Sequence, residues 1–290
     1  MILRVPANGI EIAYDSFGSP GGRPLLLIMG LGSQLIHWDE EFCELLAGHG
    51  HRVVRFDNRD AGESTHFHHA ESPVLGSDEA PYLLDDMADD TAGLLDALGW
   101  ESAHLVGVSM GGMIAQLTAI RHPNRVRSLT SIMSTPSPQA APPTDAAMAA
   151  LTAPPAPDRE AAIRRALAAC DVLGSPGYPP DLERIARTTG LGYDRCHDPA
   201  GGARQLAAIV ASADRAPRLR ELTVPTLVMH GLDDPLVPVA GGIATAEAVP
   251  GARLLTFPGM GHNLPRPLWP EFAAAIGELT ASAEVVASEG

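Results

Sequence analysis

Short apolar runs that end at turn residues alternate along the chain with segments in which apolar residues recur every three or four positions. The first pattern predicts β-strands, and the second predicts amphipathic helices. Residues 2–16 are expected to form an opening antiparallel pair. Further strands are predicted at residues 24–30, 51–57, 102–108, 125–133, 225–231 and 252–259. Helices are predicted at residues 34–48, 82–98, 110–122, 240–248 and 268–281.

This alternation of strand and helix indicates the fold class. Successive strands joined by helices pair in parallel, and the helices cover both faces of the sheet. The run PLLLIMG at residues 24–30 has no polar side chain, which is typical of a strand buried on both faces. We therefore expect an α/β fold with a mostly parallel, twisted sheet and helices on both faces.

The alternation is interrupted between residues 135 and 220. Ten prolines fall between residues 136 and 180, while residues 158–173 and 201–216 keep a helical spacing of apolar positions. Because the segment lies between two predicted core strands, we expect a helical cap, or lid, above the carboxyl ends of the strands, where ligands bind in open α/β folds. One domain is predicted, with its core at residues 1–134 and 221–290 and the cap insertion at residues 135–220.

The charge balance excludes one class of partner. A formal net charge of −15 and a pI near 5.0 provide no basic surface for nucleic acid. No apolar run approaches the ~20 residues that span a bilayer, so no membrane span is expected. The N-terminus lacks the basic, apolar and cleavage regions of a secretory signal, which predicts a cytoplasmic protein. The sequence leaves the oligomeric state open.

Cysteine and histidine spacing gives no support for a metal site. Cys43, Cys170 and Cys196 lack zinc-type spacing, so free thiols are favoured, with a bridge between Cys170 and Cys196 left open. Three histidines lie in the stretch THFHHA, residues 65–70, but no carboxylate pattern accompanies them, and a solvated loop is favoured over a metal site. No metal and no cofactor is expected.

The stretch VGVSMGGM, residues 106–113, places Ser109 where a strand ends and a helix begins, with Gly107 and Gly111 around it. A serine hydroxyl attacks a carbonyl carbon only when a base removes its proton and the side chain is free of its neighbours. A sharp strand-to-helix turn provides that exposure and crowds the positions two before and two after it, which favours glycine at both. The pattern predicts Ser109 as a nucleophile, and a serine that merely caps a helix is the disfavoured alternative.

A base and an orienting acid are expected in loops that follow later strands, because those loops meet at the same edge of the sheet. His262 lies in such a loop, after the last predicted strand, and Asp233 and Asp234 follow the strand at residues 225–231. We predict His262 as the general base and Asp234 as the acid that fixes its tautomer. Asp233 is expected to brace the turn before Pro235, although the pattern leaves the choice between the two aspartates open.

The oxyanion formed when Ser109 attacks needs two N–H donors. The backbone N–H of Met110, directly after the nucleophile, is expected to be one of them. The other is expected from Leu31, in the MGLGS loop that follows the strand at residues 24–30.

Five stretches, MGLG, DNRDAGES, GVSMGGMIAQ, HGLDDPLVP and GMGH, resemble the α/β-hydrolase superfamily in their order, and the likeness covers almost the whole chain apart from the insertion. The chain is similar to actinobacterial serine carboxylesterases of the aclacinomycin methylesterase type, which tend to carry Met-Gly in the oxyanion loop and an Arg-Asp pair as at Arg59 and Asp60. The resemblance implies an α/β-hydrolase fold, the roles given above to the five site residues, and a cap whose apolar inner face shapes the pocket.

These residues predict a serine hydrolase that cleaves small to medium hydrophobic carboxylic esters through an acyl-enzyme intermediate. A perhydrolase or cofactor-free haloperoxidase, a hydrolase of carbon–carbon bonds, a thioesterase and a lipase would use the same catalytic triad, and they remain open. A non-enzymatic binding protein built on this fold is the alternative from another class.

Two groups of charged residues receive a structural interpretation. The stretch DNRD, residues 57–60, is expected to form a hydrogen-bonded turn rather than a catalytic cluster. Arg164, Arg165, Arg195 and Arg204 in the insertion could anchor a carboxylate, but solvated positions are favoured for them. The partner that the sequence predicts is therefore a neutral small-molecule ester.

Overall fold

The computed structural model describes residues 1–69 and 80–289. Its sheet has eight strands in the order β1-β2-β4-β3-β5-β6-β7-β8. The strands are β1 (Leu3–Ala7), β2 (Ile10–Phe17), β3 (Arg23–Ile28), β4 (His51–Phe56), β5 (Ala103–Val108), β6 (Val126–Ile132), β7 (Thr226–Gly231) and β8 (Arg253–Phe257). β2 pairs antiparallel with β1 and β4, and all other pairs are parallel. The predicted fold class is confirmed.

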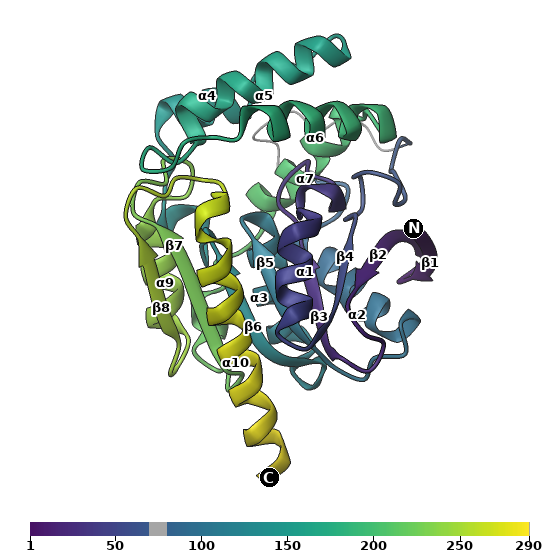
Figure 1. Ribbon diagram of the computed structural model, residues 1–290, viewed down its shortest axis with the longest axis vertical. Helices are drawn as coiled ribbons and strands as arrows, with labels where there is room; N and C mark the ends of the chain where they lie inside the picture. Colours follow the sequence, from purple (N-terminus) through teal and green to yellow (C-terminus); the bar gives the residue numbers. More distant parts are fainter. Residues whose placement is uncertain (70–79, 290) are drawn as a thin grey trace.

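Helices cover both faces of this sheet (Figure 1). One layer consists of α1 (Glu40–Gly48) and α10 (Trp269–Glu289), and the other consists of α2 (Leu84–Ala97), α3 (Met110–Arg121) and α9 (Val239–Ala248). Alternate residues of β3 point to opposite faces: Leu26 and Ile28 join the core under α2 and α3, whereas Leu25 and Leu27 join the core under α1 and α10. The strand is buried on both faces, as its sequence predicts.

Two helix boundaries differ from the sequence-based prediction. The helix expected from residue 34 begins at Glu40, because the side chain of Asp39 accepts a hydrogen bond from the N–H of Glu41 and caps α1 there. Leu35–His37 form a separate 3₁₀ turn. The last helix continues to Glu289 rather than ending at residue 281.

A helical segment connects β6 to β7 and lies across the carboxyl ends of the parallel strands (Figure 1). It contains the 3₁₀ turn Pro138–Ala140 and the helices α4 (Asp145–Leu151), α5 (Arg159–Leu173), α6 (Leu182–Arg195), α7 (Pro199–Ala211) and α8 (Ala216–Leu219). The side chains of Thr144, Asp158 and Asp181 cap α4, α5 and α6. The short α8 packs against α3 and α9. We refer to residues 133–225 as the α4–α8 segment.

Buried ion pairs attach the α4–α8 segment to the turn after β4. The guanidinium of Arg204 on α7 makes two hydrogen bonds to Asp60, with nitrogen–oxygen distances of 2.9 and 2.7 Å, and the residue is 1% exposed. Arg195 of α6 donates to Asp57 at 2.9 Å. The expectation that Arg195 and Arg204 are solvated is therefore wrong. The reason is that the carboxylates of this turn are buried and need cationic donors, which the α4–α8 segment provides.

The turn at residues 57–60 is hydrogen bonded, as predicted. Asp57 accepts from the N–H groups of Leu35 and Glu63 at 2.6 and 2.9 Å, and its carbonyl accepts from the hydroxyl of Ser64. A Cβ atom at Gly62 would lie 2.2 Å from the Asp57 carboxylate, so only glycine fits there. The turn thus holds its acidic side chains for structural contacts.

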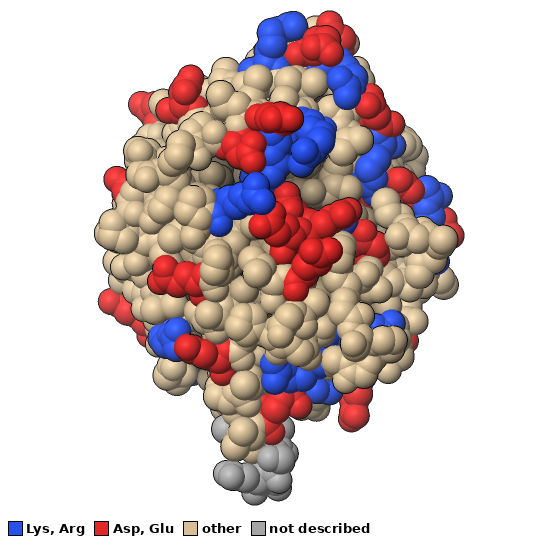
Figure 2. Space-filling view, in the orientation of Figure 1, with Lys and Arg blue, Asp and Glu red and all other residues tan. Residues whose placement is uncertain are grey.

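The surface charges seen in Figure 2 are mixed, and the cysteines do not form disulfides. On the face shown in Figure 2, acidic and basic side chains are interspersed, and no single basic patch dominates it. The three cysteines are free thiols. Within residues 1–69 and 80–289, no helix is both long enough and apolar enough to cross a bilayer.

Four histidines, three of them buried and His37 half-buried, make the stability of the fold sensitive to acid. Burial lowers the pKa of His37, His51, His104 and His230. The unfolded chain protonates these groups at their ordinary pKa of about 6.5, whereas the folded state resists protonation there. Their contribution to stability is therefore present above pH 6.5 and is lost as the pH falls below it.

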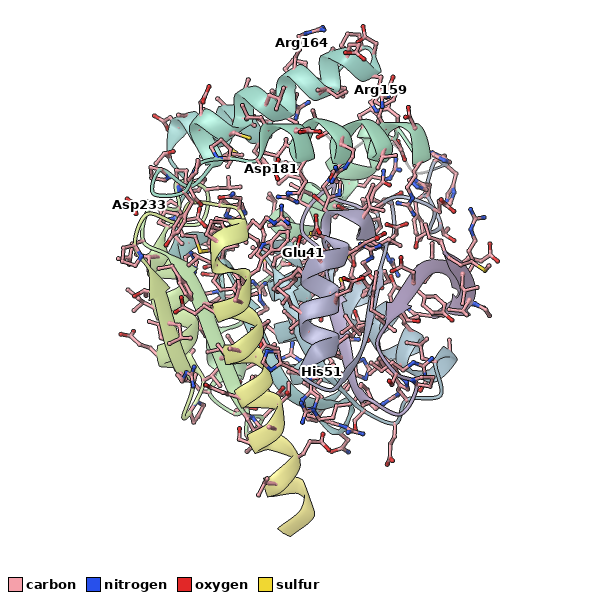
Figure 3. The ribbon with its side chains drawn as sticks, viewed as in Figure 1. Glu41, His51, Arg159, Arg164, Asp181 and Asp233 are labelled. Carbon is pink, nitrogen blue, oxygen red and sulfur yellow. The ribbon has the colours of Figure 1, made fainter. Side chains whose placement is uncertain are left out.

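We expect the Tm to fall by about 5 °C or more between pH 7.5 and pH 5.5, because the unfolded state binds more protons over this range. His51, labelled in Figure 3, is held between the carbonyl of Leu46 and the hydroxyl of Thr280. His51→Gln should reduce the pH dependence, and His69→Gln, at an exposed position, should leave it unchanged. A Tm that is constant or rises toward pH 5.5 would contradict the assignment.

The ion pair between Arg204 and Asp60 gives a second prediction. Arg204→Met leaves the buried Asp60 carboxylate without its counter-charge and should lower the free energy of unfolding by about 3–5 kcal/mol. Arg164 is exposed on the outer side of α5 (Figure 3), so Arg164→Met should change it by no more than about 0.5 kcal/mol. Urea denaturation measures both. Equal effects of the two substitutions would show that the buried pair is not what attaches α7.

Candidate active site

Ser109 occupies a sharp corner between β5 and α3. Its φ of 53° and ψ of −121° lie in a region that residues with a side chain rarely adopt. The backbone is held there because the Ser109 N–H donates to the carbonyl of Ile132 at 2.9 Å and its carbonyl accepts from the hydroxyl of Ser134 at 2.8 Å. Such a conformation costs about 1–3 kcal/mol, which the surrounding structure offsets. The serine side chain is left half-exposed, beyond the end of the strand.

The two glycines around Ser109 are required by close contacts. A Cβ atom at Gly107 would lie 2.1 Å from the carbonyl oxygen of Gly111, and one at Gly111 would lie 2.1 Å from the carbonyl oxygen of Ile28. Both distances are far below van der Waals contact, so neither position tolerates a side chain. The crowding that the sequence predicts at this turn is present.

The loops after β7 and β8 bring a histidine and an aspartate to this corner. The Nε2 atom of His262 lies 3.0 Å from the Oγ of Ser109, and its Nδ1 atom lies 2.7 Å from Oδ2 of Asp234. The other carboxylate oxygen of Asp234 accepts from the N–H groups of Leu236 and Val237, both at 2.9 Å. With the carboxylate accepting at Nδ1, the hydrogen-bond pattern assigns the proton to Nδ1 and leaves Nε2 to accept the serine hydroxyl.

Asp233 has a different environment from Asp234. It is exposed at the edge of the molecule (Figure 3), and its Oδ2 accepts from the N–H of Gly259 at 2.7 Å. It braces the turn after β8 and not, as predicted from the sequence, the turn before Pro235, because the N–H groups at that turn bond to Asp234 instead. The structure therefore brings Asp234, and not Asp233, to the imidazole of His262.

His230, which was not predicted as a site residue, lies next to Asp234. It is fully buried, its Nε2–H donates to the carbonyl of Val237 at 2.7 Å, and this nitrogen lies 3.7 Å from Oδ2 of Asp234. Burial lowers the pKa of His230, which keeps it neutral. The sequence signal that could have identified His230 is its place near the end of β7, just before the loop that carries Asp234.

The two residues predicted as oxyanion donors lie on either side of Ser109. Met110 is the first residue of α3, so its N–H is one of the unpaired donors of a helix N-terminus. Leu31 lines the same cavity as Ser109, and a Cβ at the neighbouring Gly30 would lie 3.3 Å from that of Ser109. Within the described residues, neither backbone N–H donates to a protein acceptor.

Ser109 and His262 open into a cavity of about 510 Å³ between the sheet and the α4–α8 segment. Its walls are mostly apolar. The core contributes Met29, Leu31, Trp38, Phe42, Val108, Met113, Leu264 and Trp269, and Met133 lines the cavity from the start of the α4–α8 segment. The helices α4 to α7 contribute Met148, Leu151, Leu173, Ile185, Leu206, Ile209 and Val210.

One arginine reaches this cavity, and it is not among the four that the sequence suggested. Arg184 of α6 has its NH1 atom 3.5 Å from Oδ2 of Asp39, and its guanidinium lies over the ring of Trp269, 5.3 Å from the centroid. Helix α6 itself was not predicted, so the spacing that would have placed Arg184 on its inner face was missed. The paired carboxylate balances the positive charge.

The α4–α8 segment also fixes the loop that carries His262. The N–H of His262 donates to the carbonyl of Leu173 at 2.7 Å, and the N–H of Gly261 donates to the hydroxyl of Ser175 at 2.9 Å. The N–H of Gly177 donates to the carbonyl of Gly259 at 2.8 Å. We call residues 259–263 the histidine loop. Its backbone depends on the residues that follow α5.

His66, His68 and Asp198 are the described residues whose spacing approaches that of a metal site. Nδ1 of His66 lies 2.7 Å from Oδ2 of Asp198, and that of His68 lies 3.6 Å from it. Arg204 already donates to the same oxygen at 3.0 Å, and this positive charge opposes a bound cation. His66 is buried against Asp198, so the solvated-loop interpretation is wrong for it, whereas His68 and His69 are exposed.

Comparisons with known proteins agree with this architecture. Residues 23–265 match the family model described as the alpha/beta hydrolase fold. The chain is 30% identical to rhodomycin D methylesterase DauP of Streptomyces sp. (strain C5), over 97% of this chain and 98% of that protein. It is also 30% identical to rhodomycin D methylesterase DnrP of Streptomyces peucetius, over 95% and 97% of the two chains.

A solved structure shows that the likeness also holds for the fold. The meta-cleavage product hydrolase CumD from Pseudomonas fluorescens IP01, an S103A mutant complexed with acetates, has a TM-score of 0.76 and 22% identity, and the match covers 97% of this chain and 98% of that one. The identity is low, so this match bears on the fold alone. Together with the family match over residues 23–265, it leads to one conclusion: the chain belongs to the α/β-hydrolase family.

Proposed function

We propose that this protein is a serine hydrolase that cleaves carboxylic esters, with Ser109 as the nucleophile, His262 as the general base and Asp234 as the orienting acid. The observation that carries the proposal is the continuous hydrogen-bonded chain from Asp234 through His262 to Ser109, with distances of 2.7 and 3.0 Å. The three side chains come from the connections after β5, β7 and β8, and two of them, Ser109 and His262, line one cavity. The esterases among the relatives support the same reaction class.

In the proposed reaction, Nε2 of His262 takes the proton of the Ser109 hydroxyl as its oxygen bonds to the ester carbonyl carbon. The tetrahedral intermediate collapses, the carbon–oxygen bond to the alcohol breaks, and the imidazolium returns its proton to the leaving alkoxide. Water, deprotonated by the same histidine, then attacks the acyl-enzyme and releases the acid. Asp234 remains ionised throughout and stabilises the imidazolium.

The oxyanion is assigned to the backbone N–H groups of Leu31 and Met110. Such donors are each worth about 10²–10³ in rate when they are fixed before charge develops. The N-terminus of α3 adds a favourable dipole at the same point. Because both donors belong to the main chain, the reaction places no demand on the side chains of these two residues.

The shape and the lining of the cavity favour neutral, small to medium hydrophobic esters as substrates. Its walls are apolar, and the one arginine in them is paired with Asp39. A volume of about 510 Å³ lies within the range of cavities that bind small organic molecules. In this proposal, residues 135–220 form a cap whose inner face shapes the pocket and residues 1–134 and 221–290 form the catalytic core.

Ser109→Ala removes the nucleophile. We expect it to lower the hydrolysis of p-nitrophenyl butyrate by about 10⁴-fold or more, because the triad residues act as a unit. A fluorophosphonate probe should label the parent protein and not the variant. A variant that hydrolyses the ester as fast as the parent would exclude Ser109 as the nucleophile.

The two adjacent aspartates form a matched pair. Asp234→Asn should lower kcat by about 10³-fold or more, because the amide no longer selects the imidazole tautomer that leaves Nε2 free. Asp233→Asn keeps an oxygen for the Gly259 N–H and should leave kcat within about threefold of the parent. Steady-state kinetics with p-nitrophenyl butyrate distinguish them. A larger loss in the Asp233 variant would reverse the assignment.

A further inference from the structure

The loop that carries Leu31 is hydrogen bonded to side chains of the core at both of its ends. We call residues 30–34 the oxyanion loop. Before it, the carbonyl of Met29 accepts from the side chain of Asn58 at 2.9 Å, and after it, the N–H of Leu35 donates to Asp57 at 2.6 Å. Between these points the side chain of Leu31 packs against the core, and the N–H of Gln34 bonds to Nδ1 of His37. The side-chain acceptor for the N–H of Gly32 comes from the α4–α8 segment.

The oxyanion loop contains a four-residue turn at its centre. The N–H of Ser33 donates to the carbonyl of Gly30 at 3.2 Å, and Gly32 has a φ of +65°. A four-residue turn with a left-handed third residue differs from the commoner type I turn mainly by a rotation of its central peptide. Here the central peptide joins Leu31 to Gly32, next to the N–H assigned to the oxyanion. Glycine at the third position permits both forms.

Gln205 of α7 selects one form of this turn. Its side-chain oxygen accepts from the N–H of Gly32 at 2.7 Å, and its amide nitrogen donates to the carbonyl of Arg59 at 2.7 Å. The side chain is fully buried, so rotation of the Leu31–Gly32 peptide would leave its oxygen without a donor. The second bond fixes which end of the amide faces the loop.

The position of Gln205 is itself fixed. The adjacent Arg204 makes the buried ion pair with Asp60. A Cβ atom at Gly201 would lie 2.3 Å from the carbonyl oxygen of Asp60, so α7 packs directly against the turn after β4. At the far end of the oxyanion loop, the Gln34 amide donates to the carbonyl oxygens of Gly192 and Cys196 at 2.7 and 3.0 Å.

We propose that Gln205 is a positioning residue for the oxyanion hole: by binding the N–H of Gly32 it fixes the peptide that directly follows the N–H of Leu31, and with it the turn that presents this N–H to the developing charge. This inference rests on the proposed function and extends it. It makes the α4–α8 segment part of the catalytic framework as well as a wall of the pocket. A donor contributes to catalysis to the extent that its position is set before the oxyanion forms.

Gln205→Met tests the proposal, because methionine has nearly the same length and volume and lacks the amide. We expect kcat for p-nitrophenyl butyrate to fall by about 10-fold or more while KM stays within about threefold, since the lost interaction acts on the transition state. The Ki of an aryl trifluoromethyl ketone, which forms a tetrahedral oxyanion adduct with the serine, should rise by a similar factor.

Two further variants distinguish positioning from folding. Gln205→Glu keeps an oxygen for the Gly32 N–H and should retain more of kcat than Gln205→Met. Ser212→Ala removes a hydroxyl that bonds only to the carbonyl of Ala208 at the end of α7, and it should change neither kcat nor Ki. The Tm of each variant reports its folding.

The outcomes separate this inference from the proposed function. A parent protein that neither hydrolyses the ester nor reacts with a fluorophosphonate would overturn the proposed function. An active parent whose Gln205→Met and Gln205→Glu variants keep its kcat and ketone Ki, whatever their Tm, would overturn the role of Gln205 alone. A rise in KM with an unchanged kcat would also overturn it, because Gln205 would then act on substrate binding.

Discussion

The left-handed backbone conformation of Ser109 constrains the packing of the strands, the helix and the loops around it. The corner brings β5 and α3 so close together that positions 107 and 111 have no room for a side chain. It is held in place by the carbonyl of Ile132 on the next strand and by Ser134 beyond it. The sheet must therefore be parallel and complete at this point before the hydroxyl can be presented. The loops after β7 and β8 then reach it from the same edge.

The α4–α8 segment contributes to the geometry of the site on two sides. Leu173 and Ser175 bond to the backbone of the histidine loop, and Gln205 bonds to the oxyanion loop. The segment is in turn attached to the core by Arg204, whose charge is matched by Asp60. Contacts of this kind couple the position of these helices to the spacing between Ser109, His262 and the loop that carries Leu31. The segment therefore acts as a scaffold as well as a cover.

The local features of this site were predictable, and the distant ones were not. An apolar strand, two glycines around a serine and an apolar helical stripe all lie within residues 103–120, so the corner at Ser109 could be inferred from the order of residues alone. His262 and Asp234 followed because loops after parallel strands share an edge. The sheet was predicted correctly for the same reason, since each strand carries its own pattern.

Contacts between residues that are far apart in the sequence could not be predicted from the local pattern of residues. Arg204 pairs with a residue 144 positions away, and Gln205 accepts from a residue 173 positions away. Nothing in the residues next to Arg204 in the sequence distinguishes a buried cation from a solvated one. Arg204 was therefore predicted, wrongly, to be solvated. Helix α6 was missed because its polar outer face and its prolines at the start resemble a connection. Arg184, which reaches the cavity, was missed with it.

Helix α4 has a consequence for how this protein could diverge from its relatives. It contributes Met148 and Leu151 to the cavity wall, and among the described residues no hydrogen bond joins its side chains to the histidine loop or the oxyanion loop. Exchanges there would change which acyl groups fit while leaving the chemical machinery intact. Substitutions that alter substrate preference would be expected to accumulate in this helix first, because the neighbouring helices are bonded to the two loops beside Ser109.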